Sequence, residues 1–178
     1  MLFSPVLTLL LGIFTLVATA DLQQALPAVV FLSVGGIPVL VYFIYTYFRE
    51  RDQEIDPGRE ARQSIYLLAV FSFTLTTVIF GTELLTNDFW FNMGMLMAIF
   101  FALGFLIDKY FDKYSMHMAT FAFMVMLLID NANPGFALLF MLTPVIIWSR
   151  LELHRHTWLQ IMWGWALGLA VGLLAWTL

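Results

Sequence analysis

The chain has 178 residues, of which 62% are hydrophobic and 11% are charged, and its mean hydropathy is +0.90. This composition lies outside the range of soluble domains and predicts an integral membrane protein, whose length allows about six or seven crossings and no sizeable soluble domain. The absence of cysteine excludes disulfides, thiolate metal sites and cysteine nucleophiles, whereas the net charge of −4 says little until the charges are placed along the chain.

Hydrophobic segments follow one another along the whole chain, at about 2–20, 27–48, 64–84, 88–107, 115–130, 135–148 and 157–178. We therefore expect an all-α polytopic membrane helix bundle of six to seven spans, forming a single domain over residues 1–178. The fifth and sixth segments are short, and the sixth contains Pro144. Each of these two either just crosses the bilayer or packs with the other as a buried hairpin.

The basic residues are confined to the connections that follow the second, fourth and sixth segments: Arg49, Arg51, Arg59, Arg62, Lys109, Lys113, Arg150 and Arg155. In a chain of seven spans these three connections lie on one side of the membrane. Retention of Lys and Arg predicts that this side is the cytoplasmic face of a bacterial or archaeal plasma membrane. Anion binding by the same connections is a second explanation for the confinement of the basic residues. His117, His154 and His156 favour it, because the retention of Lys and Arg on the cytoplasmic side does not concern histidine.

The connection 149–156 reads SRLELHRH, with five residues between the Ser149-Arg150 pair and His156. This spacing resembles the third signature of the type 2 phosphatidic acid phosphatase superfamily, the membrane relatives of vanadium haloperoxidases, which reads S-R-x5-H-x3-D. Gln160 stands where that family has aspartate. The glycine-rich segment 164–172 that follows is also similar to the family.

Two other stretches resemble the remaining signatures. The sequence YSMH at 114–117, preceded by Lys113, keeps the serine and histidine of the second signature, P-S-G-H, and lacks its proline and glycine. The first signature, K-x6-R-P, has no lysine here. Its nearest counterpart is DPGREAR at 56–62, with Arg59 and Arg62, which resembles a divergent bacterial version in which two arginines three apart open a span. The resemblance covers about residues 49–172 and implies a helical core similar to that of the family.

The resemblance implies a site that hydrolyses a lipid phosphomonoester or a polyprenyl pyrophosphate at the bilayer surface. His156 would attack phosphorus and form a phosphohistidine, and His117 would protonate the leaving oxygen. The phosphate oxygens would be bound by Arg150, Ser115, Arg59, Arg62 and Lys113. Arginines would neutralise the charge, so no metal and no cofactor is expected, and the partners are membrane lipids rather than nucleic acid.

Gln160 is the main departure from the family. On a helix it shares a face with His156, and its carbonyl can accept a hydrogen bond from the imidazole, but it has no charge. In serine proteases the change from the orienting aspartate to an amide lowers turnover by about 10⁴. Either the enzyme is slow, or another acid such as Glu152 or Asp108 supplies the charge, or the site binds phosphate without turnover. Gln160→Asp is expected to raise the activity.

Two other functions remain open. One is a catalytically weak or inactive relative that binds anionic lipid headgroups, and the other is a small transporter or structural subunit whose basic connections only set topology. A transporter usually has ionisable residues at mid-span, and Glu83 is the nearest to one. Gly164, Gly168 and Gly172 repeat every four residues, which predicts close helix packing rather than chemistry.

Overall fold

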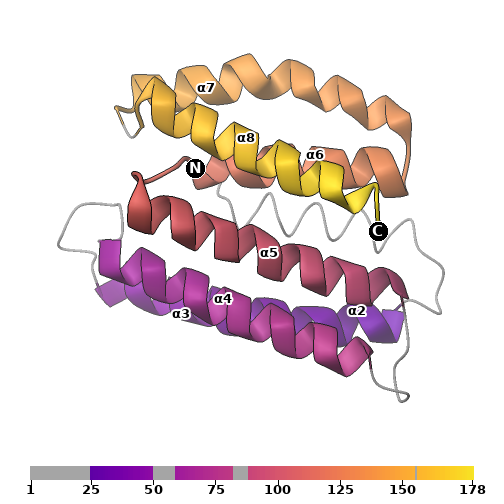
Figure 1. The fold of residues 1–178 in the computed structure, drawn as a ribbon. Coiled ribbons are helices and arrows are strands. Elements are labelled where there is room, and N and C mark those ends of the chain that lie inside the picture. The colour runs from indigo at the N-terminus through magenta and orange to yellow at the C-terminus, as the bar shows by residue number, and fades with distance from the viewer. Residues whose placement is uncertain (1–24, 50–58, 82–87, 155) are drawn as a thin grey trace. The chain divides into compact units, whose positions relative to one another are not determined.

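The computed structural model describes residues 25–49, 59–81, 88–154 and 156–178, and within these ranges the chain is helical with no strand. The elements are α2 (Ala25–Phe31), η2 (Leu32–Gly36), α3 (Ile37–Arg49), α4 (Arg59–Phe80), α5 (Asp88–Tyr110), α6 (Met116–Asn131), η3 (Pro134–Leu142), α7 (Thr143–Glu152) and α8 (Trp158–Ala175) (Figure 1). Here η2 is a π-helix and η3 a 3₁₀-helix. The expected segment 2–20 lies outside the described residues, as do Arg51, Glu83 and Arg155.

Five of the described helices are long and apolar enough to cross a membrane: Pro27–Thr46, Arg59–Phe80, Asp88–Tyr110, Pro134–Glu152 and Trp158–Ala175. Helix α6 is also apolar, but it has only 16 residues. The prediction of an all-helical, multi-pass membrane protein is therefore confirmed. The chain divides into two compact units, one over 23–111 and one that contains 112–178.

Several helices extend further than the hydrophobic segments predicted. Helix α4 begins at Arg59, and α7 continues to Glu152. Arg59 and Arg62 therefore lie at the start of α4, and Arg150 lies in the last turn of α7, where connections were expected. Hydropathy reports only the part of a helix that sits in hydrocarbon, whereas the helical hydrogen bonds continue into the interface where charged side chains reach water.

In the unit 23–111, the π-helix η2 lies between α2 and α3, just before Pro38. Proline has no N–H and its ring clashes with the carbonyl four residues earlier, so a wider turn there accommodates it. Gly35 in η2 lies against α4, since a Cβ at this position would come within 2.6 Å of the Phe73 ring. The Phe31 ring centroid lies 5.5 Å from that of Phe73 and 5.0 Å from that of Trp90. These ring contacts join α2 to α4 and α5.

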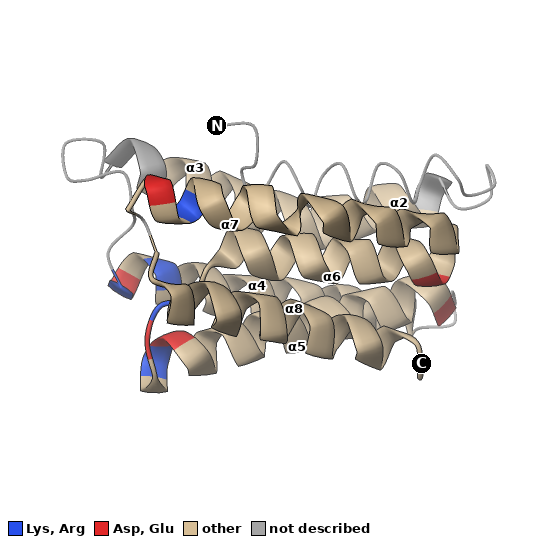
Figure 2. Ribbon diagram, turned by 90° about the horizontal axis from the view of Figure 1, so that it is seen from above, with Lys and Arg blue, Asp and Glu red and all other residues tan. Residues whose placement is uncertain are grey.

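Helices α4 and α5 pair in antiparallel directions over their whole length (Figure 1). Near the end of α4 and the start of α5, a Cβ on Gly94 would come within 2.6 Å of the Thr77 hydroxyl, so glycine permits the close approach. At the opposite end Arg62 contacts Asp108. The charged residues that the structure describes lie at the ends of the helices of each unit, and the intervening turns are apolar (Figure 2).

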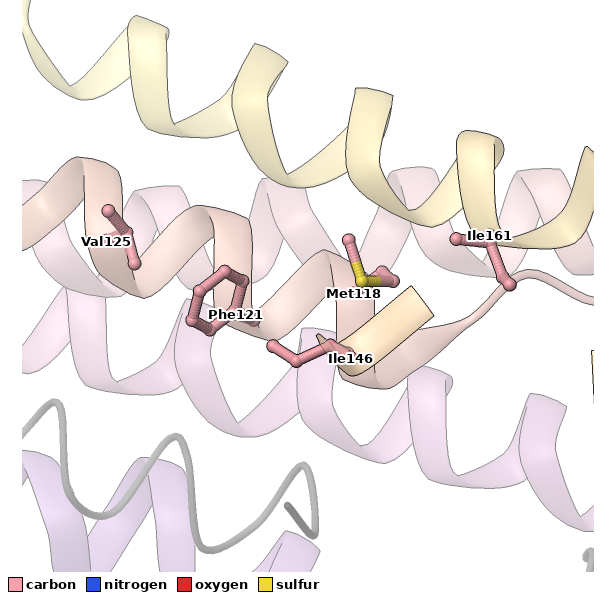
Figure 3. Close-up of a cluster of buried hydrophobic side chains, with 5 residues drawn as sticks. All are labelled: Met118, Phe121, Val125, Ile146 and Ile161. Carbon is pink, nitrogen blue, oxygen red and sulfur yellow. The ribbon is translucent and has the colours of Figure 1, made fainter. Parts of the chain in front are cut away.

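In the unit 112–178, α6 and α8 run parallel, because α7 returns the chain between them. A Cβ on Gly164, Gly168 or Gly172 would come closer than 3.0 Å to Ser115, Ala119 or Met126, respectively. The predicted role of this glycine stripe in close packing is confirmed. The other side of α6 contributes to an apolar cluster with α7 and α8, made of Met118, Phe121, Val125, Ile146 and Ile161 (Figure 3).

Candidate functional site

The N-terminal ends of α6 and α8 lie side by side. The backbone N–H of Ser115 donates to the carbonyl of Gln160 at 2.9 Å, and Gly164 lies directly against the backbone of Ser115. His117 follows Ser115 by two residues, and His156 precedes Gln160 by four. The starts of α6 and α8, with His117 and His156 close to them in sequence, are therefore neighbours within one unit.

The last turn of α7 lies at this same end of the unit. Leu151 packs against the apolar cluster to which Met118 and Ile161 belong. Arg150 immediately precedes Leu151 and is half-buried. The chain then turns at His154, which has a φ of 51° and whose N–H donates to the Leu151 carbonyl at 2.9 Å. Arg150 and His156 therefore lie on either side of a tight turn.

Thr157 caps the N-terminus of α8 together with Gln160. The Thr157 hydroxyl accepts from the Gln160 N–H at 3.4 Å, and Gln160 Oε1 accepts from the Thr157 N–H at 3.1 Å. This reciprocal pair is a capping box, and the pattern T-x-x-Q at 157–160 was a signal for it in the sequence. The capping-box hydrogen bonds with Thr157 therefore fix the Gln160 side chain at the start of α8, whether or not a substrate is bound.

His156 contacts the same amide oxygen. Its Nδ1 is 3.3 Å from Gln160 Oε1, and His156 is half-buried while Gln160 is 6% exposed. A carbonyl oxygen can only accept, so this contact is a hydrogen bond when Nδ1 carries the proton. The lone pair of the neutral ring is then on Nε2.

Asp112 completes this arrangement and was not among the residues singled out from the sequence. Its Oδ2 accepts from Gln160 Nε2 at 2.8 Å, and its Oδ1 accepts from the Lys113 N–H at 2.7 Å. The acids expected to compensate for Gln160 were Glu152 and Asp108. Asp112 lies 48 residues before Gln160, so only the packing of α6 on α8 brings them together.

The contacts of Gln160 determine how its amide is oriented. The Thr157 N–H points at one end of the amide, and the Asp112 carboxylate lies at the other. The reverse orientation would place the NH₂ against the Thr157 N–H and the oxygen against a carboxylate. Both contacts would be repulsive, which leaves Oε1 toward His156.

Ser115 is fully buried, and its hydroxyl has no hydrogen-bond partner among the described residues. It occupies the N-cap position of α6 without making a side-chain capping bond. Lys113 and His117, on either side of it, are half-buried. A buried hydroxyl between two helix N-termini is an arrangement that suits an anion, because both helix dipoles present their positive ends there.

Arg59 and Arg62 belong to the other unit, where they surround Asp108. Arg62 Nε and Nη2 each lie 3.1 Å from Asp108 Oδ1, and Arg59 Nε donates to the Asp108 carbonyl at 3.0 Å. Gln63 Nε2 donates to Oδ2 of the same carboxylate at 3.4 Å. Asp108 is 0% exposed, and its charge is compensated by arginines of its own unit.

No protein-family model, no curated protein and no solved structure matches the chain.

Proposed function

We propose that the protein is a membrane-embedded lipid phosphatase, a divergent relative of the type 2 phosphatidic acid phosphatases, which cleaves a lipid phosphomonoester or a polyprenyl pyrophosphate. The observation that supports this best is the hydrogen bond between His156 Nδ1 and Gln160 Oε1, at 3.3 Å. It favours the tautomer with the lone pair on Nε2, which is the form in which Nε2 can attack phosphorus.

In the proposed reaction, the Nε2 lone pair of His156 attacks phosphorus while the bond from phosphorus to the leaving oxygen breaks. The leaving oxygen takes a proton from the His117 imidazolium. Water then attacks phosphorus, the bond from nitrogen to phosphorus breaks, and the proton of the water passes to neutral His117. Both histidines return to their starting states, so the cycle balances.

Phosphate binding is assigned to Arg150, Ser115 and Lys113, which lie in the same unit as the two histidines. Guanidinium groups match the oxygens of a phosphoryl group and stabilise its charge in the transition state. The parallel N-termini of α6 and α8 add positive dipole ends next to Ser115. These features support an anion at this end of the unit.

The test is phosphate release by the purified full-length protein from phosphatidate, lysophosphatidate, phosphatidylglycerophosphate and a polyprenyl pyrophosphate. Release is expected from at least one substrate and is expected to disappear in His156→Ala. The matched control is His154→Gly, which removes the neighbouring histidine and should keep the activity. An acid-labile phosphoprotein trapped in the wild type and absent in His156→Ala would identify the intermediate.

A second function is binding of an anionic headgroup without hydrolysis, and Gln160 is the observation that favours it. An amide cannot stabilise an imidazolium by charge as the family's aspartate does. If no substrate releases phosphate above the His156→Ala background, while vanadate or inorganic phosphate still binds in a manner that depends on Arg150, this function replaces the first.

A further inference from the structure

Asp112 stands at the outer end of a chain of hydrogen bonds that reaches His156 through Gln160. The distances are 2.8 Å from Asp112 Oδ2 to Gln160 Nε2 and 3.3 Å from Gln160 Oε1 to His156 Nδ1. We infer that Asp112 is a positioning residue that fixes the orientation of the Gln160 amide and, through it, the tautomer of His156. The catalytic consequence rests on the proposed function, whereas the tautomer can be measured without turnover.

The charge of Asp112 is what makes it the stronger of the two groups that orient the amide. The other group is the Thr157 N–H, which makes a neutral hydrogen bond to Oε1 at 3.1 Å. A hydrogen bond to an ionised carboxylate is about twice as strong as a neutral one. Gln160 is also buried, where an amide group pointing the wrong way finds no water to compensate it.

Both oxygens of Asp112 are used as acceptors, and asparagine cannot reproduce this. Oδ1 accepts from the Lys113 N–H at 2.7 Å while Oδ2 accepts from Gln160. In Asp112→Asn, an oxygen kept for Lys113 would turn the asparagine NH₂ toward the Gln160 NH₂. Without the carboxylate, only the neutral contact with the Thr157 N–H opposes reversal of the Gln160 amide. A reversed amide offers its NH₂ to His156, which selects the opposite tautomer, with the proton on Nε2.

The same geometry predicts a rescue. In the double variant Asp112→Asn with Gln160→Glu, the asparagine NH₂ would donate to one oxygen of the introduced glutamate, and the other oxygen would accept from Thr157 and His156. Every donor again meets an acceptor, with the amide and the carboxylate exchanged. Glutamate has the length of glutamine and also suits the capping box. The single variant Gln160→Glu instead sets two carboxylates against each other.

The experiment uses the full chain in detergent micelles, labelled with ¹⁵N-histidine, at a pH where the imidazoles are neutral. The chain has three histidines, and His154→Gly and His117→Asn assign their signals. Ring nitrogens with and without a proton are resolved by their shifts and by their couplings to the ring carbons' protons. The wild type is expected to show His156 with the proton on Nδ1.

Asp112→Asn is expected to shift the ratio of the two His156 tautomers at least about tenfold toward Nε2–H, and the double variant to restore it. Asp130→Asn, an exposed carboxylate at the far end of α6, is the matched control and should change nothing. Two results would overturn the inference: an unchanged tautomer in Asp112→Asn, or a wild-type proton on Nε2. The signal of His154 reports whether each variant keeps its fold.

Activity supplies the second measurement. Loss of an orienting partner typically lowers activity by about tenfold to a hundredfold, so Asp112→Asn is expected to lower kcat by that factor with little change in KM, and the double variant to regain most of it. If the wild type releases no phosphate, the proposed function fails while the tautomer still decides the role of Asp112. If the tautomer does not respond while activity is present, the inference alone fails.

Discussion

The carboxylate of Asp108 is completely buried and lies 3.1 Å from both Nε and Nη2 of Arg62, which joins the end of α5 to the start of α4. A buried carboxylate is stable only when its charge is compensated and its oxygens are hydrogen-bonded. Arg62, Arg59 and Gln63 provide this. The pair therefore links two spans of the unit 23–111 at a membrane surface.

Removal of Arg62 is expected to destabilise this unit. Arg62→Ala leaves Asp108 buried with weaker compensation, and the cost is expected to be about 1–3 kcal/mol, because hydrogen bonds to charged groups have this magnitude. Asp108→Asn should cost less, since no charge is left buried. The measurement is thermal unfolding in detergent. Equal Tm values for Arg62→Ala and the wild type would contradict the role of the pair.

The contact between Gly168 and α6 predicts a cost for one added methyl group. A Cβ there would meet the Ala119 carbonyl, the Ala122 side chain and the Phe123 nitrogen, so Gly168→Ala must separate α6 from α8. Overpacking of this kind costs about 1–3 kcal/mol. Gly36→Ala is the control, because its Cβ would meet only Leu32, at 3.9 Å. A lower Tm is expected for Gly168→Ala alone.

The turn at His154 predicts a stabilising substitution. Left-handed backbone costs an L-residue about 1–2 kcal/mol, and His154 has a φ of 51°. His154→Gly removes most of that cost and is expected to raise stability by up to about 1 kcal/mol. Unfolding in denaturing detergent compares it with His154→Ala, which keeps the strain. If glycine gives no gain over alanine, the turn is not strained.

Gln160→Asp is now expected to lower activity, which reverses the expectation from the sequence. An aspartate at this position would lose the amide donor and face the carboxylate of Asp112, which now accepts from Gln160 at 2.8 Å. Two adjacent carboxylates repel each other. Phosphate release by Gln160→Asp should therefore rise when Asp112→Asn is added. A single variant faster than the wild type would restore the original expectation.

Single cysteines test which side of the membrane the candidate site faces, and the chain has no native cysteine to interfere. Glu152 ends α7 beside the candidate site, whereas Asp130 and Thr177 lie near the opposite ends of α6 and α8, and all three are exposed. We expect an impermeant thiol reagent on intact cells to label Asp130→Cys and Thr177→Cys but not Glu152→Cys. If only Glu152→Cys is labelled, the candidate site faces the extracellular side of the membrane.

The sequence by itself determined that the described chain is helical and membrane-spanning, because about 20 consecutive apolar residues have few other stable states in a bilayer. It also predicted that the glycines at 164, 168 and 172 form a packing surface, since their spacing places them on one helical face. The sequence did not predict that α4 begins at Arg59 or that α7 ends at Glu152. The hydrophobic pattern covers only the residues in hydrocarbon, whereas the helical hydrogen bonds continue into the interface.

Only the tertiary structure decided the partners of the polar residues. Asp108 and Asp112 are four residues apart in a stretch with the same DKY sequence twice, yet one is buried against Arg62 and the other bonds to Gln160. No local pattern distinguishes them. The difference arises from which helix packs next to each carboxylate, and a hydrogen bond of 2.8 Å forms only where packing brings its two atoms together.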